Sequence, residues 1–124
     1  MCEGEKAADA AARLLPDWVA TASPNGAKSA NKADWSALAG RRVALWPDYD
    51  EAGRAYAQDV ARLAVAHAAG LLGLRLPLAG TPLPDGTIDP QSREPADGWD
   101  AADALEEGWT AAHLRTLEQA GALL

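Results

Sequence analysis

The sequence predicts an α/β domain, a Rossmann-like parallel sheet of about four strands with flanking helices. Short apolar runs alternate with longer segments of helical periodicity along the 124 residues, and that alternation is typical of parallel sheets with crossover helices. Residues 42–46 centre on an uninterrupted apolar run bounded by polar residues, as expected for a central strand covered on both faces. Length and pattern together indicate a single domain over residues 1–124.

The first half of the chain is expected to begin with a helix. Residues 4–15 carry alanine and leucine at helical spacing until Pro16 stops the pattern. Residues 18–21 are expected to form a short strand, which leads into Pro-Asn-Gly turn chemistry. Asp34 is expected to cap a short helical turn that Gly40 ends.

The second half continues the alternation after the central strand. Residues 50–69 are expected to form a long helix, and residues 72–78 the next strand. Residues from about 80 to 97 hold four of the eight prolines and are expected to form a variable loop. Two C-terminal helices are expected within residues 100–121, separated at Gly108.

Composition and charge limit the classes of function. No apolar run approaches the roughly 20 residues of a membrane span, and the single cysteine, Cys2, suits a reducing compartment. We therefore expect a cytoplasmic protein without membrane contact. The net charge of −7 argues against a stand-alone DNA-binding protein. It argues less against a catalytic module, because an acidic metal pocket contributes to the negative sum.

The most informative stretch is Trp-Pro-Asp-Tyr-Asp-Glu-Ala-Gly, residues 46–53. It places Asp48 and Asp50 where the central strand ends and a helix begins. Residues two apart on an extended segment point the same way, so the two carboxylates can share one divalent cation. Ligands of open α/β sheets bind outside these strand ends. The alternative explanation of the pair is a turn followed by a helix cap.

Four segments, in order, resemble the motifs of the Toprim domain, a family found in topoisomerases, bacterial-type primases, phage primase–helicases and some nucleases. Residues 3–6, Glu-Gly-Glu-Lys, resemble the glutamate motif after the first strand, and residues 23–29 resemble the loop after the second strand. Residues 46–53 resemble the acidic signature. Residues 98–105, Gly-Trp-Asp-Ala-Ala-Asp-Ala-Leu, resemble the third acidic motif. The resemblance covers residues 2–78 and 97–109.

The Toprim resemblance implies a site for Mg²⁺, with Mn²⁺ as a substitute. Asp48 and Asp50 would be the principal metal ligands, and Glu3 a further ligand or a general acid/base. These three would be the catalytic residues, and Asp100 would support the metal directly or through water. Two of these assignments have structural alternatives: Glu3 as a first-turn acid of its helix, and Asp100 as a helix N-cap.

A contact with phosphate or nucleic acid is implied by the loop that resembles the primase–helicase segment. Asn25, Gly26 and Lys28 would present backbone N–H groups and a cation near the same cleft. Lys28 and Lys32 also belong to a basic cluster that runs as far as residue 42 and contains a single acid. A solvated loop is the alternative explanation of that cluster.

The function implied by the resemblance is that of a DNA primase or primase–helicase module from a phage or other mobile element. It would join nucleotides on a DNA template, and zinc-binding and helicase domains would lie elsewhere in the intact protein. The isolated chain is expected to be weak or inactive as a nucleotidyltransferase. Two alternatives stay open: a Toprim nuclease, and a non-catalytic domain that binds nucleic acid or a protein partner.

The first strand of the Toprim pattern is expected to be truncated, because only Met1 and Cys2 precede Glu3. Loss of a central strand would expose the backbone edges of its neighbours. We expect the chain to be a piece of a larger protein. The alternative is that another segment or subunit fills the gap.

Overall fold

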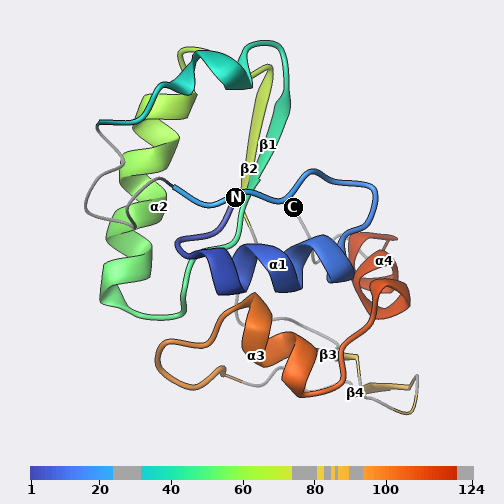
Figure 1. The fold of residues 1–124 in the computed structure, drawn as a ribbon. Helices are drawn as coiled ribbons and strands as arrows, with labels where there is room; N and C mark the ends of the chain where they lie inside the picture. Colours follow the sequence, from blue (N-terminus) through green and yellow to red (C-terminus); the bar gives the residue numbers. More distant parts are fainter. Residues whose placement is uncertain (24–31, 74–80, 83–84, 86, 90–93, 120–124) are drawn as a thin grey trace.

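The chain folds into a mixed helix and strand structure with a two-stranded parallel sheet (Figure 1). This computed structural model describes residues 1–23, 32–73, 81–82, 85, 87–89 and 94–119. No helix within those residues is long and apolar enough to cross a membrane.

Helix α1 (Glu5–Leu14) lies against α3 (Ala101–Glu106) and α4 (Ala111–Gln119), as Figure 1 shows. Its buried face consists of alanines and Leu14, and small side chains let the α1 and α3 backbones approach closely. Three tryptophans complete this first core, with Trp99 packed between Trp46 and Trp109 at ring-centroid distances of 6.1 and 5.8 Å. Such aromatic pairs add to the stabilisation that burial alone gives.

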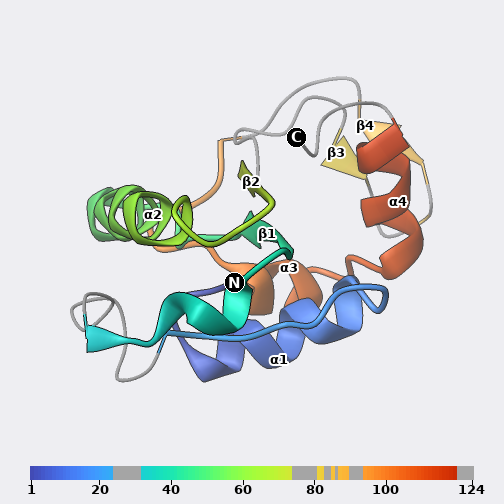
Figure 2. The same ribbon diagram turned by 90° about the horizontal axis from the view of Figure 1, so that it is seen from above.

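Strand β1 (Arg42–Leu45) pairs in parallel with β2 (Gly70–Gly73), and α2 (Glu51–Ala64) makes the crossover between them. Side chains alternate along β1. Val43 and Leu45 pack with α2 in a second core, whereas Trp46 belongs to the first core. Figure 2 shows α2 on one side of the two strands, with α1 away from it. The end of β1 therefore lies between the two cores.

The first two residues lie in line with the sheet. The Met1 ammonium donates to the Ala44 carbonyl at 2.6 Å, and Trp46 N–H donates to the Met1 carbonyl at 2.9 Å. Cys2 N–H donates to the Thr21 carbonyl at 2.9 Å, and Cys2 forms an isolated parallel bridge with Ala22. Residues 1–2 thus connect the edge of β1 to residues 21–22.

The prediction of a parallel sheet of about four strands is confirmed only in part, because the parallel sheet within the described residues has two strands. Residues 18–21 do not form a strand. The adjacent extended segment toward β1 is only two residues long, residues 1–2. The Val19 side chain is 85% exposed. A strand needs a paired neighbour over its length, so this segment makes one bridge and no ladder.

Most helices follow the prediction, with shifted ends. The long helix begins as expected but α2 ends at Ala64, and residues 65–67 form a turn. Strand β2 begins two residues earlier than predicted, and residues 74–80 lie outside the described part. Asp34 caps the short helix η2 (Trp35–Leu38) by accepting from Ser36 N–H at 2.9 Å, as predicted.

The predicted variable loop at residues 80–97 contains regular structure. Strands β3 (Thr81–Pro82) and β4 (Ile88–Asp89) pair in an antiparallel hairpin within it. The two C-terminal helices, α3 and α4, are confirmed. Gly108, which separates them, has a φ of 89°, a conformation that glycine adopts without strain.

Candidate functional site

Four acidic residues are brought together from three segments of the chain. Glu3 precedes α1, Asp48 follows β1, Asp50 is the N-cap of α2 and Asp100 is the N-cap of α3. Their mutual electrostatic influence places them in one acidic neighbourhood. We refer to Glu3, Asp48, Asp50 and Asp100 as the acidic cluster.

A short backbone bridge joins the segments that carry Asp50 and Asp100. Tyr49 N–H donates to the Trp99 carbonyl at 2.8 Å, and Gly98 N–H donates to the Tyr49 carbonyl at 3.0 Å. Gly98 has a φ of 77°, which favours glycine at this position. The bridge fixes the start of α3 beside the start of α2.

Glu3 and Asp48 are in direct contact. Asp48 N–H donates to Glu3 Oε1 at 3.3 Å. Gly53 packs against both residues, because a Cβ atom there would overlap the Asp48 carbonyl and lie 2.9 Å from Glu3 Oε1. The first turn of α2 thus approaches the pair at a distance that only glycine permits.

Asp50 and Asp100 each cap the helix that they precede. Asp50 Oδ1 accepts from Gly53 N–H at 2.6 Å, and Asp100 Oδ1 accepts from Ala102 and Asp103 N–H at 2.7 and 3.1 Å. Asp103 Oδ2 accepts from Asp100 N–H at 3.0 Å and closes a capping box. The structure therefore confirms that Asp50 and Asp100 are helix N-caps, which was the alternative explanation of these acids. A carboxylate has two oxygens and about four acceptor positions, so capping leaves capacity for a cation.

The electrostatics of the cluster favour a positive ligand. Burial, followed by repulsion from neighbouring carboxylates, raises the pKa of Asp48 to about 6; these neighbours are Glu3, Asp100, Asp50 and Asp103. Burial also raises the pKa of Glu3, with repulsion from Asp50 and Asp100, while the N–H of Asp48 lowers it. Asp48 Oδ1 is buried without a hydrogen-bond partner among the described residues. A buried, unpaired carboxylate oxygen costs free energy that a proton or a metal ion would recover.

The donor set fits Mg²⁺ in its chemistry. Hard divalent cations prefer carboxylate oxygens, and Asp48 supplies one that no donor in the described part of the chain satisfies. Within the described ranges, however, no group of three or more His, Cys, Asp or Glu side chains is arranged closely enough to hold a metal ion. The four carboxylates share a neighbourhood and are not converged on one point.

The other predicted site residues are placed as follows. Asn25, Gly26 and Lys28 lie outside the described residues. Lys32 is described and exposed. Lys6, in the first motif, pairs with Glu106 at 3.6 Å on the surface, where an ion pair contributes little to stability.

Two residues that sequence reasoning missed hold the segment before Glu3. Tyr56 Oη donates to the Cys2 carbonyl at 2.8 Å and lies 2.8 Å from Ser23 Oγ. All three are buried, and burial raises the pKa of Tyr56 to about 12. The helical pattern placed Tyr56 on the inner face of its helix, but no local signal identified a partner 54 residues away.

Comparison with known proteins gives no match among family models, curated proteins or solved structures.

Proposed function

We propose that the chain is a Mg²⁺-dependent Toprim-type module of a DNA primase or primase–helicase, acting in nucleotidyl transfer. One observation carries the proposal: the carboxylates of Glu3, Asp50 and Asp100 act electrostatically on Asp48, whose Oδ1 is buried at the end of a parallel strand without a hydrogen-bond partner among the described residues. In open α/β sheets, ligands bind outside this end of the strands. The three acidic segments, residues 3–6, 46–53 and 98–105, follow one another along the chain in the order of the Toprim motifs.

The proposed architecture is a parallel Toprim-like sheet in the order residues 20–22, residues 1–2, β1, β2. The hydrogen bonds that join residues 1–2 to β1 and to Thr21 support this order. The parallel pairing of β1 with β2 supports the other half. Two strands of this sheet would be short extended segments.

The residues have distinct roles in this proposal. Bound Mg²⁺ would neutralise phosphate charge and activate an oxygen nucleophile, and Asp48, Asp50, Glu3 and Asp100 would hold it. Helix capping fixes the orientation of Asp50 and Asp100. A carboxyl group whose pKa lies near 6, such as Asp48, can exchange a proton close to neutral pH.

The proposed partners are a DNA template and nucleotides, which the intact protein would bind with further zinc-binding and helicase domains. The net charge of −7 gives this chain a repulsive field toward nucleic acid. Template binding would therefore depend on those other domains or on local basic residues such as Lys32 and the undescribed Lys28.

A non-catalytic binding domain is the second candidate, because the carboxylates are not converged on a metal position in the described residues. A Toprim nuclease would use the same carboxylates for strand cleavage. Tyr49 is an unsuitable strand-breaking nucleophile in this structure, because its hydroxyl is bound to Glu94, an acid outside the acidic cluster, and that hydrogen bond raises the pKa of Tyr49.

The test is an activity assay on the full chain with Mn²⁺ or Mg²⁺, nucleoside triphosphates and single-stranded DNA. We expect weak template-dependent nucleotide incorporation, lost in Asp48→Asn and retained in Asp59→Asn, an exposed acid on α2. Metal-dependent cleavage of the DNA without incorporation would favour the nuclease. Absence of both activities in a chain that binds the metal would favour the non-catalytic domain.

A further inference from the structure

The tyrosine on the inner face of α2 binds the residue that precedes Glu3. Tyr56 Oη donates to the Cys2 carbonyl at 2.8 Å and lies 2.8 Å from Ser23 Oγ. A tyrosine hydroxyl has one proton. Because the bond to Cys2 uses that proton, Ser23 is the donor in the second bond. Tyr56 and Ser23 are both buried, so solvent does not compete for these bonds.

The carbonyl that Tyr56 binds belongs to the peptide group that joins Cys2 to Glu3. A peptide group is planar, so a bond that fixes its oxygen also limits where the Glu3 backbone lies. The N–H on the other side of Cys2 donates to the Thr21 carbonyl at 2.9 Å. Both main-chain groups of Cys2 are therefore bound, and the bond to Tyr56 is the one adjacent to Glu3.

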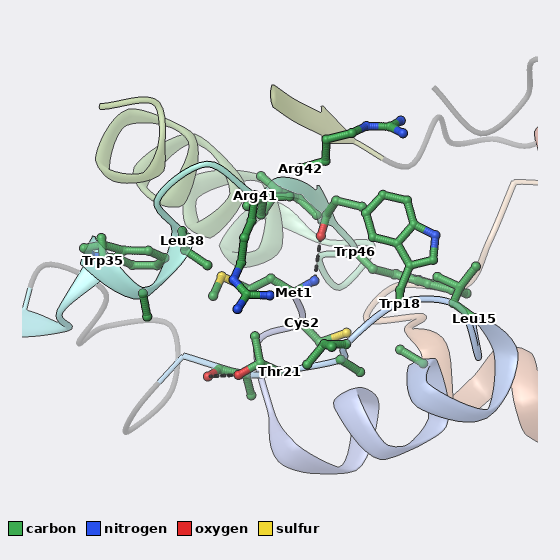
Figure 3. A pocket seen from close by; sticks show the side chains of 18 of the residues that line it. Met1, Cys2, Leu15, Trp18, Thr21, Trp35, Leu38, Arg41, Arg42 and Trp46 are labelled. Carbon is green, nitrogen blue, oxygen red and sulfur yellow. Dashed lines mark hydrogen bonds between the residues drawn. The ribbon is translucent and has the colours of Figure 1, made fainter. Parts of the chain in front are cut away.

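Packing holds this segment incompletely on one side. Met1 and Cys2 lie along a pocket of about 990 Å³ between β1 and residues 18–22 (Figure 3). Atoms that line an open space lack the contacts that a filled core would give them. The hydrogen bonds of residues 1–2 therefore contribute more to the position of Glu3 than they would in a filled core.

One side of α2 contacts the candidate site at positions three residues apart. Asp50 belongs to the acidic cluster and begins the helix. Gly53 packs against the Asp48 carbonyl and Glu3 Oε1. Tyr56 follows at the next such position, and residues three apart are neighbours on a helix surface. The same side of α2 therefore approaches the carboxylate of Glu3 through Gly53 and fixes its main chain through Tyr56.

We propose that Tyr56 is a positioning residue of the acidic cluster, whose hydroxyl holds the main chain before Glu3 so that the Glu3 carboxylate lies against Asp48. The inference deepens the proposed function and rests on it, since the cation would be bound by Glu3 and not by Tyr56. Removal of a group that orients a metal ligand typically weakens metal binding by about 10- to 100-fold. Tyr56 would thus act on the cation only through Glu3.

The test compares Tyr56→Phe with Ser23→Ala in the full chain. Each variant removes one hydroxyl from the same buried pair, but only Tyr56→Phe removes the bond to Cys2. We expect the affinity for Mn²⁺, measured by paramagnetic broadening, to fall about tenfold in Tyr56→Phe and to change less than about twofold in Ser23→Ala. An equal loss in both variants, or a loss in neither, would overturn the proposal.

A second readout needs no metal. Asp48 N–H donates to Glu3 Oε1, so hydrogen exchange of the Asp48 amide reports where the Glu3 carboxylate lies. We expect this exchange to be at least about fivefold faster in Tyr56→Phe than in Ser23→Ala, and equal rates would overturn the positioning role. Faster exchange without Mn²⁺ binding in the unmodified chain would support that role and contradict the proposed metal site.

A third readout needs no variant and stands even where a substitution prevents folding. The Tyr56 hydroxyl proton of the unmodified chain should exchange slowly enough with water to be observed by NMR, because it is buried and bonded to the Cys2 carbonyl. A Tyr56 hydroxyl in fast exchange with water would overturn the proposal.

Discussion

At the residue scale, Asp48 is the residue at which hydrogen bonding, burial and repulsion between carboxylates conflict most strongly. Its backbone N–H donates to Glu3, yet its side-chain Oδ1 is buried and has no hydrogen-bond partner within the residues that the structure describes. Burial and neighbouring carboxylates both disfavour its charged form. The site is therefore destabilised at neutral pH until a proton or cation compensates the charge.

This imbalance predicts a pH-dependent stability. The pKa of Asp48 is raised to about 6 in the folded state, above its unfolded value of about 3.9, so the folded state binds the proton more tightly. The contribution of Asp48 is most favourable below pH 4 and is lost as the pH rises to 6. Because the residue is only half-buried, we expect a loss of about 1 kcal/mol.

Asp48→Asn should abolish the loss of folding stability that the unmodified chain shows as the pH rises. In urea denaturation we expect the variant to be more stable than the unmodified chain by about 1 kcal/mol at pH 7.5, with little difference at pH 4. Asp59→Asn, which changes an exposed acid beside Arg62, should show no such trend. An equal difference at both pH values for Asp48→Asn would disprove the assignment of the raised pKa.

Gly53 sets how closely α2 approaches the acidic cluster. Gly53→Ala would place a Cβ against the Asp48 carbonyl and 2.9 Å from Glu3 Oε1. The clash with a backbone atom outweighs the helix-propensity gain of about 1 kcal/mol, so we expect a net destabilisation of about 2 kcal/mol. Gly73→Ala, with no atom within 4 Å of its added Cβ, should change stability by less than about 0.5 kcal/mol. A stabilised Gly53→Ala variant in thermal unfolding would be incompatible with this packing.

At the element scale, the N-termini of two helices position two of the carboxylates. Asp50 and Asp100 precede α2 and α3 and are held by first-turn N–H groups. An anion near a helix N-terminus is also favoured by the helix dipole. The same bonds that begin the helices therefore orient two members of the acidic cluster.

Substitution of Asp100 separates its two roles. Asp100→Ala should lower the free energy of unfolding by about 1 kcal/mol through loss of the cap, whereas Asp100→Ser keeps a capping oxygen and should change it by less than about 0.5 kcal/mol. Both variants should bind Mn²⁺ more weakly, because both lack the carboxylate. Urea denaturation and a Mn²⁺ titration give the two readouts. If Asp100→Ser binds Mn²⁺ normally, Asp100 is a helix cap and no ligand.

The elements that could be predicted are those with local causes. Helix α1, the turn capped by Asp34, strand β1 and the starts of α2 and α3 follow from spacing and capping residues. The strand at residues 18–21 was predicted wrongly, because a strand depends on its neighbours and the segment meets only residues 1–2. The β3–β4 hairpin was missed because its two-residue strands give no periodic pattern.

At the scale of the whole molecule, the candidate site depends on contacts between distant segments. The Tyr49–Trp99 bridge brings α2 and α3 together, and the Tyr56 hydroxyl holds the Cys2 carbonyl just before Glu3. The sequence motifs predicted the acids that form the candidate site. They did not predict these connections, because a hydrogen bond across 50 residues leaves no local pattern.

The central claim is that four acidic residues from three segments of the chain bind one divalent cation. Its most direct test is a Mn²⁺ titration of the full chain followed by residue-resolved NMR, with paramagnetic broadening as the readout. We predict saturable broadening centred on Glu3, Asp48, Asp50 and Asp100, with at least about tenfold weaker affinity in Asp48→Asn. Broadening spread over exposed acids such as Asp9 and Asp59, and unchanged in that variant, would contradict the claim.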